Sequence, residues 1–166
     1  MPPAGYAFAA DPSQQLARMD GSAVLGLVEG ADYLLTNEYE KSLLQSKAGL
    51  TDDQLLDRVK IRVTTLGKDG VEIVGRDIER IHVPIAREMQ ASDPTGVGDG
   101  FRAGFFAGLS WGLGLERSAQ IGSLLATLVL ETVGTQEYEV RADLFVKRLA
   151  ESYGDQAAEE VRQHLN

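Results

Sequence analysis

The most informative stretch of this sequence is Asp93-Pro-Thr-Gly-Val-Gly-Asp99, which stands directly before a helical pattern. Gly96 and Gly98 have no side chains, so their peptide N–H groups can point into one shared concavity. The positive end of the dipole of the following helix strengthens the attraction of this concavity for an anion. The stretch therefore predicts an oxyanion or phosphate hole that is built without lysine or arginine.

Asp99 stands at the mouth of this predicted hole. A carboxylate near a helix N-terminus is favoured in its ionised form, so Asp99 is a candidate acceptor for the proton of an attacking hydroxyl. A Gly-x-Gly-Asp turn can also be only a tight loop with an acidic first helical turn. Spacing alone leaves both interpretations open.

The helix expected after this loop carries glycines on its apolar face. The residues that recur at helical spacing are Phe101, Gly104, Phe105, Gly108 and Leu109. Because each glycine costs about 1 kcal/mol of helix propensity relative to alanine, we expect this face to lie very close to a neighbouring segment. Residues 115–133 are apolar nearly all round and predict a buried helix.

Ahead of the loop, short apolar runs alternate with helical patterns. Strands are expected at residues 6–10, 32–36 and 61–66, and helices at about 22–30, at 37–48 and after the capping box of Thr51-Asp-Asp-Gln54. Such alternation is typical of a parallel sheet covered by helices. Residues 71–74 and 81–84 alternate apolar and polar positions as antiparallel edge strands do.

The sequence therefore predicts an α/β fold, a three-layer sandwich with a mainly parallel sheet. Two amphipathic helices are expected toward the end, at residues 140–149 and 158–165, separated by Gly154. Because the sequence contains no internal repeat or linker, residues 1–166 are expected to form a single domain, with residues 139–166 as its C-terminal helices.

The composition excludes several kinds of function. With 25 Asp and Glu against 16 Lys and Arg, the formal net charge of −9 argues against a general nucleic-acid binder. Since the chain has no cysteine, disulfides, thiolate nucleophiles and thiolate metal sites are excluded, and His82 and His164 have no metal-ligand spacing. No stretch reaches the roughly 20 apolar residues of a membrane-spanning helix, and residues 1–5 do not begin a signal peptide. A soluble, cytoplasmic protein is therefore expected.

Residues 93–101 (Asp-Pro-Thr-Gly-Val-Gly-Asp-Gly-Phe) resemble the second signature of the ribokinase-like (PfkB) kinases, which phosphorylate sugars and nucleosides with ATP. Three further segments follow the order of that family: the Asp11-Pro12 turn, the Asn-x-x-Glu motif in Asn37-Glu-Tyr-Glu40, and the Thr-x-Gly-x-x-Gly nucleotide loop in Thr65-Leu-Gly-Lys-Asp-Gly70. Residues 36–40 and 131–137 are most similar to bacterial adenosine-kinase-like members. The resemblance extends over about residues 6–138.

The resemblance implies a role for each matched position in the glycine loop. Asp99 would take the proton from the acceptor hydroxyl. The amides of Gly96, Val97 and Gly98 would hold the charge of the γ-phosphoryl group during its transfer. Phosphoryl transfer requires this chemistry, since positioning and charge stabilisation supply most of the catalysis.

The resemblance also implies that Asn37 and Glu40 organise Mg²⁺ near the phosphates. Glu40 would act through water, which suits an ion that keeps several of its waters. The same pair is also a capping box, with an N-cap asparagine and a glutamate three residues later. Thr51 and Gln54 have the same form and no implied role, so capping and metal binding coexist as interpretations of the motif.

Thr65, Gly67 and Gly70 would line the nucleotide, because glycines let the backbone approach it. Without the family, the same residues could be only the end of a strand and an Asp-Gly turn. Asp93 and Thr95 match positions that help to hold an activating K⁺ ion in some members, although Asp93 could equally cap a turn.

The leading hypothesis is an ATP-dependent phosphotransferase that acts on a hydroxyl of a sugar or nucleoside. Since family members are substantially longer, the chain is expected to be the C-terminal, nucleotide-binding half, and to form a homo-oligomer or associate with the missing N-terminal half. The alternative is a non-catalytic nucleotide-binding module left by truncation of such a kinase. A dinucleotide-binding unit is disfavoured, because no Gly-x-Gly-x-x-Gly follows the first strand.

Overall fold

The computed structural model describes residues 6–165, so the first five residues, where no signal peptide is expected, and Asn166 lie outside it. The chain divides into two compact units. The first unit lies within residues 1–67 and 71–82, and the second within residues 68–70 and 83–166. The single domain expected for residues 1–166 stays a prediction.

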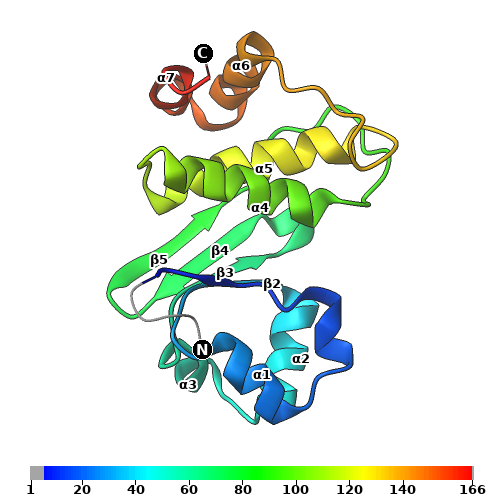
Figure 1. Ribbon diagram of the computed structural model, residues 1–166. Helices are drawn as coiled ribbons and strands as arrows, with labels where there is room; N and C mark the ends of the chain where they lie inside the picture. The colour runs from blue at the N-terminus through cyan, green and yellow to red at the C-terminus, as the bar shows by residue number, and fades with distance from the viewer. Residues whose placement is uncertain (1–5, 166) are drawn as a thin grey trace. The chain divides into compact units, whose positions relative to one another are not determined.

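The first unit is built on a mixed sheet, which over residues 6–165 has five strands in the order β1-β2-β3-β4-β5 (Figure 1). These strands are β1 (Ala9–Ala10), β2 (Ala31–Asn37), β3 (Val59–Thr65), β4 (Val71–Gly75) and β5 (Ile78–Val83). β1 pairs with β2 and β2 with β3 in parallel, whereas β3 and β4 are antiparallel. The predicted α/β class and the change to antiparallel pairing after residue 66 are confirmed.

The first strand is shorter than the sequence predicts. A buried strand is expected over residues 6–10, but only Ala9–Ala10 is a strand, and Tyr6 is 76% exposed. Pairing with β2 begins at Phe8, whose N–H donates to the Asp32 carboxylate at 2.9 Å and whose carbonyl accepts the Asp32 N–H at 3.0 Å. Because a side chain accepts the N–H of Phe8, the regular ladder does not continue toward Tyr6.

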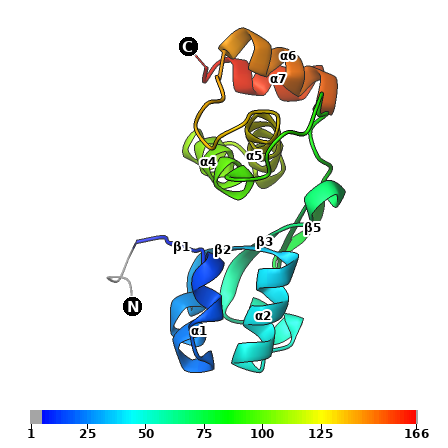
Figure 2. The ribbon, with the colours of Figure 1, turned by 90° about the vertical axis from the view of Figure 1, so that its right-hand side faces the viewer.

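The helices of the first unit are α1 (Gly21–Val28), α2 (Glu38–Ala48) and α3 (Asp52–Leu56), with a 3-10 helix η1 (Ser13–Ala17) before them and a second, η2 (Gly67–Asp69), after β3. Figures 1 and 2 show α1 and α2 on one face of the sheet. Val24, Leu34, Leu44 and Leu55 are fully buried between these helices and the strands. Both α2 and α3 begin at capping boxes, as the sequence predicts.

The second unit is helical. Its helices are α4 (Val97–Ser110), α5 (Leu115–Leu130), α6 (Ala142–Tyr153) and α7 (Asp155–Arg162). α6 extends beyond its expected end at residue 149, and Gly154, with a φ of +90°, separates it from α7. None of the helices formed by residues 6–165 has the length and apolar content needed to cross a membrane.

The glycine face of α4 packs directly on α5, side by side with it in Figures 1 and 2, as the sequence predicts. A Cβ at Gly104 would lie 2.7 Å from the Cα of Gly122, and a Cβ at Gly108 would lie 2.7 Å from the Cα of Ser118. Since carbon atoms prefer a separation of about 3.5–4.0 Å, only glycine lets the two backbones approach this closely. The burial of Phe101 and Phe105 on the same face offsets the loss of helix propensity.

Candidate functional site

The predicted anion loop begins at a turn that hydrogen bonds hold in place. The amides of Ser92 and Asp93 both donate to the carbonyl of Leu130 at the end of α5, at 2.8 and 3.1 Å. Asp93 Oδ1 accepts the Thr95 N–H at 2.9 Å. This bond holds the pKa of the Asp93 carboxyl below its usual range. Asp93 thus caps the turn that leads into the loop.

Gly96 is the N-cap of α4 and has a left-handed conformation, with a φ of +83°. A Cβ there would lie 3.1 Å from Thr135 Cγ2, so the backbone angle and the neighbouring side chain both favour glycine. The next amide, that of Val97, donates to the Pro94 carbonyl at a long 3.3 Å. Among the described residues no side chain caps α4, and the uncapped start of a 14-residue helix suits the binding of an anion.

Asp99 lies in the first turn of α4, where its side chain is 88% exposed. Its Oδ1 accepts a hydrogen bond from Arg102 Nη1 at 3.2 Å, and a Cβ at Gly98 would lie 2.9 Å from the same nitrogen. Arg102 therefore lies against the loop. The sequence interpretation omits this residue, although its i,i+3 spacing from Asp99 predicts that the two side chains meet on the helix surface. Because ion pairs at this exposure are weak, the Asp99 carboxylate stays accessible.

Asn37 and Thr65, in the first unit, end the parallel strands β2 and β3 and are partners in the register of the sheet. Glu40 lies in the first turn of α2, which starts directly after Asn37. Ligands of open α/β sheets bind beyond the carboxyl ends of the strands, so these three residues lie at an edge suited to binding. Gly67 follows with a φ of +58°, and a Cβ there would meet nothing within 4 Å among residues 6–165.

Asn37 and Glu40 form the capping box that the sequence offers as one interpretation. Asn37 Oδ1 accepts the Glu40 N–H at 2.8 Å, and Glu40 Oε2 accepts the Asn37 N–H at 2.9 Å. Thr51 and Gln54 make the equivalent bonds at 3.3 and 2.9 Å. Because the box uses one oxygen of the Glu40 carboxylate, the second oxygen can still accept from water or bind a cation.

The oxygen donors at this sheet edge suit a magnesium ion that arrives with a nucleotide. Within residues 6–165 no group of three or more Asp, Glu or His side chains could by itself hold a metal ion. Mg²⁺ is usually bound by one or two carboxylates, together with phosphate oxygens and several waters. The amide of Asn37 and the carboxylate of Glu40 fit that mode of binding, which needs no all-protein cage.

Gly70, in the second unit, is required by packing. Its φ is +89°, and a Cβ would overlap the carbonyl oxygen of Val83 and lie 2.9 Å from the Cα of Pro84. Gly67 meets no such neighbour in the described chain, so the two glycines of the predicted nucleotide loop differ in their structural reason. Packing against Val83 and Pro84 is therefore sufficient to explain Gly70, whereas a Cβ at Gly67 would meet nothing within 4 Å among the described residues.

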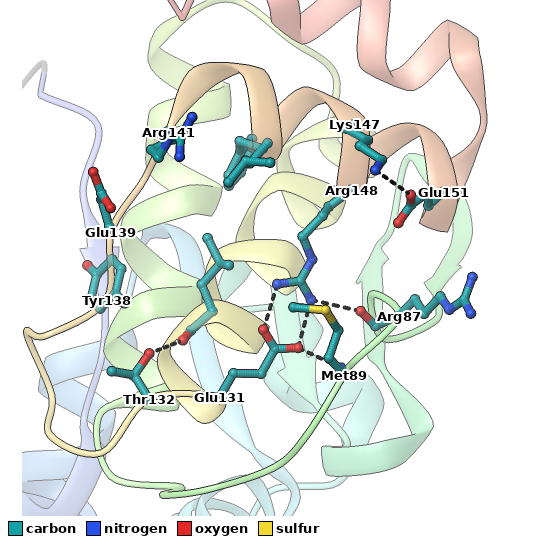
Figure 3. A pocket seen from close by; sticks show the side chains of 13 residues that line it. Arg87, Met89, Glu131, Thr132, Tyr138, Glu139, Arg141, Lys147, Arg148 and Glu151 are labelled. Carbon is teal, nitrogen blue, oxygen red and sulfur yellow. Dashed lines mark hydrogen bonds and ion pairs between the residues drawn. The ribbon is translucent and has the colours of Figure 1, made fainter.

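A cavity of about 620 Å³ lies in the second unit, between the end of α5, α6 and the segment before the anion loop (Figure 3). Glu131 and Arg148 form a bidentate ion pair in its lining, with N–O distances of 2.6 and 2.7 Å. Met89, Leu128 and Phe145 supply apolar surface. The described lining includes none of the predicted site residues, so the sequence interpretation missed this cavity.

Comparisons of the sequence with protein-family models and with curated proteins indicate the same family. The family model described as pfkB family carbohydrate kinase matches residues 7–141. A nucleoside kinase from Methanocaldococcus jannaschii is 32% identical over 139 residues, which are 84% of this chain and 46% of that protein. The chain spans about half the length of the curated relatives it matches.

Solved structures agree with the sequence comparison. The structure of Burkholderia thailandensis nucleoside kinase in complex with inosine superposes with a TM-score of 0.86 at 31% identity, covering 90% of this chain and 50% of that one. The structure of the same kinase in complex with ADP-inosine gives a TM-score of 0.86 at 31% identity, covering 90% of this chain and 47% of that one. The predicted ribokinase-like fold is confirmed by these likenesses and by one to a ribokinase from Thermotoga maritima, with a TM-score of 0.66 at 23% identity over 96% of this chain and 50% of that one. Because the family model covers well over half of its residues, this chain belongs to the pfkB family of carbohydrate kinases.

Proposed function

We propose that the protein serves the ATP-dependent transfer of a γ-phosphoryl group to a hydroxyl of a nucleoside or sugar. The observation that carries this proposal is the uncapped start of α4, where two glycines of the loop precede the exposed carboxylate of Asp99. Backbone N–H groups that bind an anion beside an exposed carboxylate would supply the two things that the transfer needs, charge stabilisation and a proton acceptor.

In this proposal Asp99 takes the proton from the acceptor hydroxyl as its oxygen attacks the phosphorus. The amides of Gly96, Val97 and Gly98 donate hydrogen bonds to the oxygens of the transferring group. Val97 shares its N–H with the long bond to Pro94, which is weak enough to be exchanged for a charged acceptor. The start of α4 holds the positions of these donors, so binding the phosphoryl group would require only that the Val97 N–H exchange its bond to Pro94.

The nucleotide is proposed to be ATP with Mg²⁺. Mg²⁺ would neutralise charge on the phosphates, and Asn37 and Glu40 would organise it, with Glu40 acting through water. Thr65, Gly67 and Gly70 line the nucleotide. Support for a nucleotide comes from the relative solved with ADP-inosine. A K⁺ ion at Asp93 and Thr95 stays a prediction, as does the cytoplasmic location.

The acceptor is proposed to be a nucleoside, with sugars as the second class. The names of the relatives support this order, because both the archaeal and the bacterial relative are nucleoside kinases and one was solved with inosine. Adenosine, the acceptor implied by the predicted similarity of residues 36–40 and 131–137 to adenosine-kinase-like members, stays a prediction within that class.

The test of the proposed base is Asp99→Asn, which preserves the shape of the side chain and removes its proton-accepting charge. We expect Mg·ATP affinity within about twofold of wild type and phosphoryl transfer lowered by about 10²- to 10⁴-fold. Asp143→Asn is the matched control, since Asp143 also lies in a first helical turn, is 67% exposed and pairs with an arginine at 3.1 Å. Retained turnover in Asp99→Asn would remove Asp99 from the mechanism.

A second candidate is a non-catalytic module that binds the nucleotide only. It would use the uncapped start of α4 to hold the phosphates but would not use Asp99 as a base. Calorimetry with Mg·ATP, followed by ADP-release assays with inosine, adenosine, ribose and fructose, separates the two. Binding without turnover on every acceptor supports the module, and turnover on any of them supports the kinase.

Association with another chain is also proposed. β1 lies at an edge of the five-stranded sheet described over residues 6–165, and the outer side of an edge strand favours pairing with a further strand. The further strand is proposed to come from a second copy of this chain or from the N-terminal half that the longer family members carry. Analytical ultracentrifugation tests this, and a monomer at all concentrations would count against a homo-oligomer.

A further inference from the structure

The ion pair of Glu131 and Arg148 connects three segments of the second unit. Glu131 follows the last residue of α5, and Arg148 lies in α6. The two guanidinium nitrogens donate to the two carboxylate oxygens at 2.6 and 2.7 Å, and each side chain is only 12% exposed (Figure 3). A bidentate pair of this kind fixes direction as well as distance, so it sets how α6 lies against the end of α5.

The same pair holds the backbone of the segment that leads to the anion loop. Arg148 Nη2 donates to the Arg87 carbonyl at 2.9 Å, and Glu131 Oε1 accepts the Met89 N–H at 2.7 Å (Figure 3). A single ion pair therefore binds both the carbonyl of Arg87 and the N–H of Met89. Residues 87–89 lie outside helices and strands and are exposed, so the pair fixes a backbone that no regular structure holds.

A second anchor follows on the same helix end and continues to the loop. The carbonyl of Leu130, the residue before Glu131, accepts the N–H groups of Ser92 and Asp93. Asp93 in turn accepts the Thr95 N–H, and Thr135, four residues after Glu131, lies 3.1 Å from the position of a Cβ at Gly96. The contacts thus run without interruption from Arg148 to the N-cap of α4.

The energetics favour a pair that acts as a unit. Burial by itself would raise the pKa of Glu131, but the hydrogen bonds from Arg148 and from the Met89 N–H outweigh it and lower that pKa. Removing one partner would leave the other as a shielded charge without its counter-charge, which is far more costly than the loss of an exposed pair. A change at either residue is therefore expected to disturb the backbone that the pair holds.

We infer that Glu131 and Arg148 are positioning residues for the anion loop of residues 93–99, to which they give a fixed approach through residues 87–93. Neither residue lies among the predicted phosphate-binding groups, and both act through the backbone that they bind. The effect of Glu131 and Arg148 on phosphate binding rests on the proposed function. Their effect on the position of the loop does not depend on that function.

The test measures amide hydrogen exchange in wild type, Glu131→Gln, Arg148→Met and the double variant. Within residues 89–96 we expect the hydrogen-bonded amides of Met89, Ser92, Asp93 and Thr95 to exchange about tenfold faster or more in both single variants. The double variant should exchange no faster than either, because the two residues act as one unit. Exchange in β2 and β3 of the first unit is expected to stay as in wild type. This local pattern distinguishes positioning from a general loss of stability.

The matched control is the ion pair of Arg117 and Glu160, which joins α5 to α7 in the same unit at 2.8 Å and is 16% and 37% exposed. Arg117→Met and Glu160→Gln are expected to leave exchange at residues 89–96 unchanged. Equal exchange at residues 89–96 in wild type and Glu131→Gln, or the same acceleration in the control variants, would overturn the inference.

Calorimetry with Mg·ATP completes the test. If wild type binds Mg·ATP, Glu131→Gln and Arg148→Met are expected to bind it about fivefold more weakly or worse, and the control variants as tightly as wild type. Faster exchange with unchanged affinity would refute positioning of the phosphate site. If wild type binds no Mg·ATP, the proposed function fails, and the exchange data alone decide whether the pair holds the loop.

Discussion

The substitution Glu40→Gln distinguishes helix capping from magnesium binding as the role of the Asn37-x-x-Glu40 motif. It does so because a second capping box in the same chain already has glutamine at the equivalent position. In the box of α3, Gln54 already stands three residues after the N-cap, and its side-chain oxygen accepts the Thr51 N–H at 2.9 Å. Glu40 accepts the Asn37 N–H at the same 2.9 Å. Glutamine at residue 40 is therefore expected to keep the capping box and remove only the negative charge.

The expected magnitudes differ for the two roles. If Glu40 only caps α2, the variant loses the attraction of a charge for the start of the helix, about 0.3–1 kcal/mol in the free energy of unfolding. If Glu40 also holds the waters of Mg²⁺, the affinity for Mg·ATP falls about tenfold or more, which corresponds to about 1.4 kcal/mol. Affinity for ATP without the metal should not fall, because the variant removes a negative charge.

The assay is calorimetric titration with ATP, once with Mg²⁺ and once with a chelator, alongside urea unfolding. Gln54→Glu is the matched control, since it makes the reciprocal change at the equivalent position of α3 and should leave both affinities unchanged. An affinity for Mg·ATP in Glu40→Gln equal to that of wild type would refute the metal role and leave capping as the whole function of the residue. An equal loss with and without Mg²⁺ would also refute it.

Two further predictions concern stability. Gly104→Ala is expected to lower the free energy of unfolding by about 1–3 kcal/mol, because overlap with the Gly122 backbone outweighs a gain of about 1 kcal/mol in helix propensity. The control is Gly26→Ala in α1, where a Cβ would meet nothing within 4 Å among residues 6–165. It should raise the free energy of unfolding, measured by urea titration, by about 0.5–1 kcal/mol. If Gly104→Ala stabilised the protein, the close packing of α4 and α5 would be contradicted. Since the pKa of Glu131 is lowered in the folded protein, its ionised form stabilises the fold above roughly pH 4, and this contribution is lost as the pH falls. The difference in free energy of unfolding between wild type and Glu131→Gln should therefore shrink from pH 7 to about pH 3, and a difference independent of pH would show that the charge contributes nothing.

The features that the sequence predicts correctly have a short-range cause. The capping boxes at Asn37 and Thr51 join residues three apart, so the motif contains both partners of each bond. The glycines of α4 predict a close neighbour because helical spacing alone places them on one face. The first strand is the instructive exception, since the Asp32 carboxylate that shortens it lies 24 residues away from Phe8.

Charged side chains show where sequence patterns stop being sufficient. Arg62 lies inside the predicted strand of residues 61–66, where an arginine would ordinarily be assigned to the solvent face. The structure makes it one of the largest fully buried side chains, 1% exposed, with nitrogens 3.1 Å from Asp52 and 3.2 Å from Glu72. Its two partners come from α3 and β4. The alternation of side chains along β3 cannot indicate residues that belong to other elements.

The sequence by itself determined the α/β class, the order of most helices and strands, and the family motifs, because each depends on residues a few positions apart. Only the tertiary structure decided that Asn37 and Thr65 are partners at one sheet edge, and that Glu131 and Arg148, 17 residues apart, hold the approach to the anion loop. The pattern of apolar and polar side chains indicates which face of a helix or strand is buried. Which residues pack against that face depends on how the separate elements pack together, and this is a property of the whole fold.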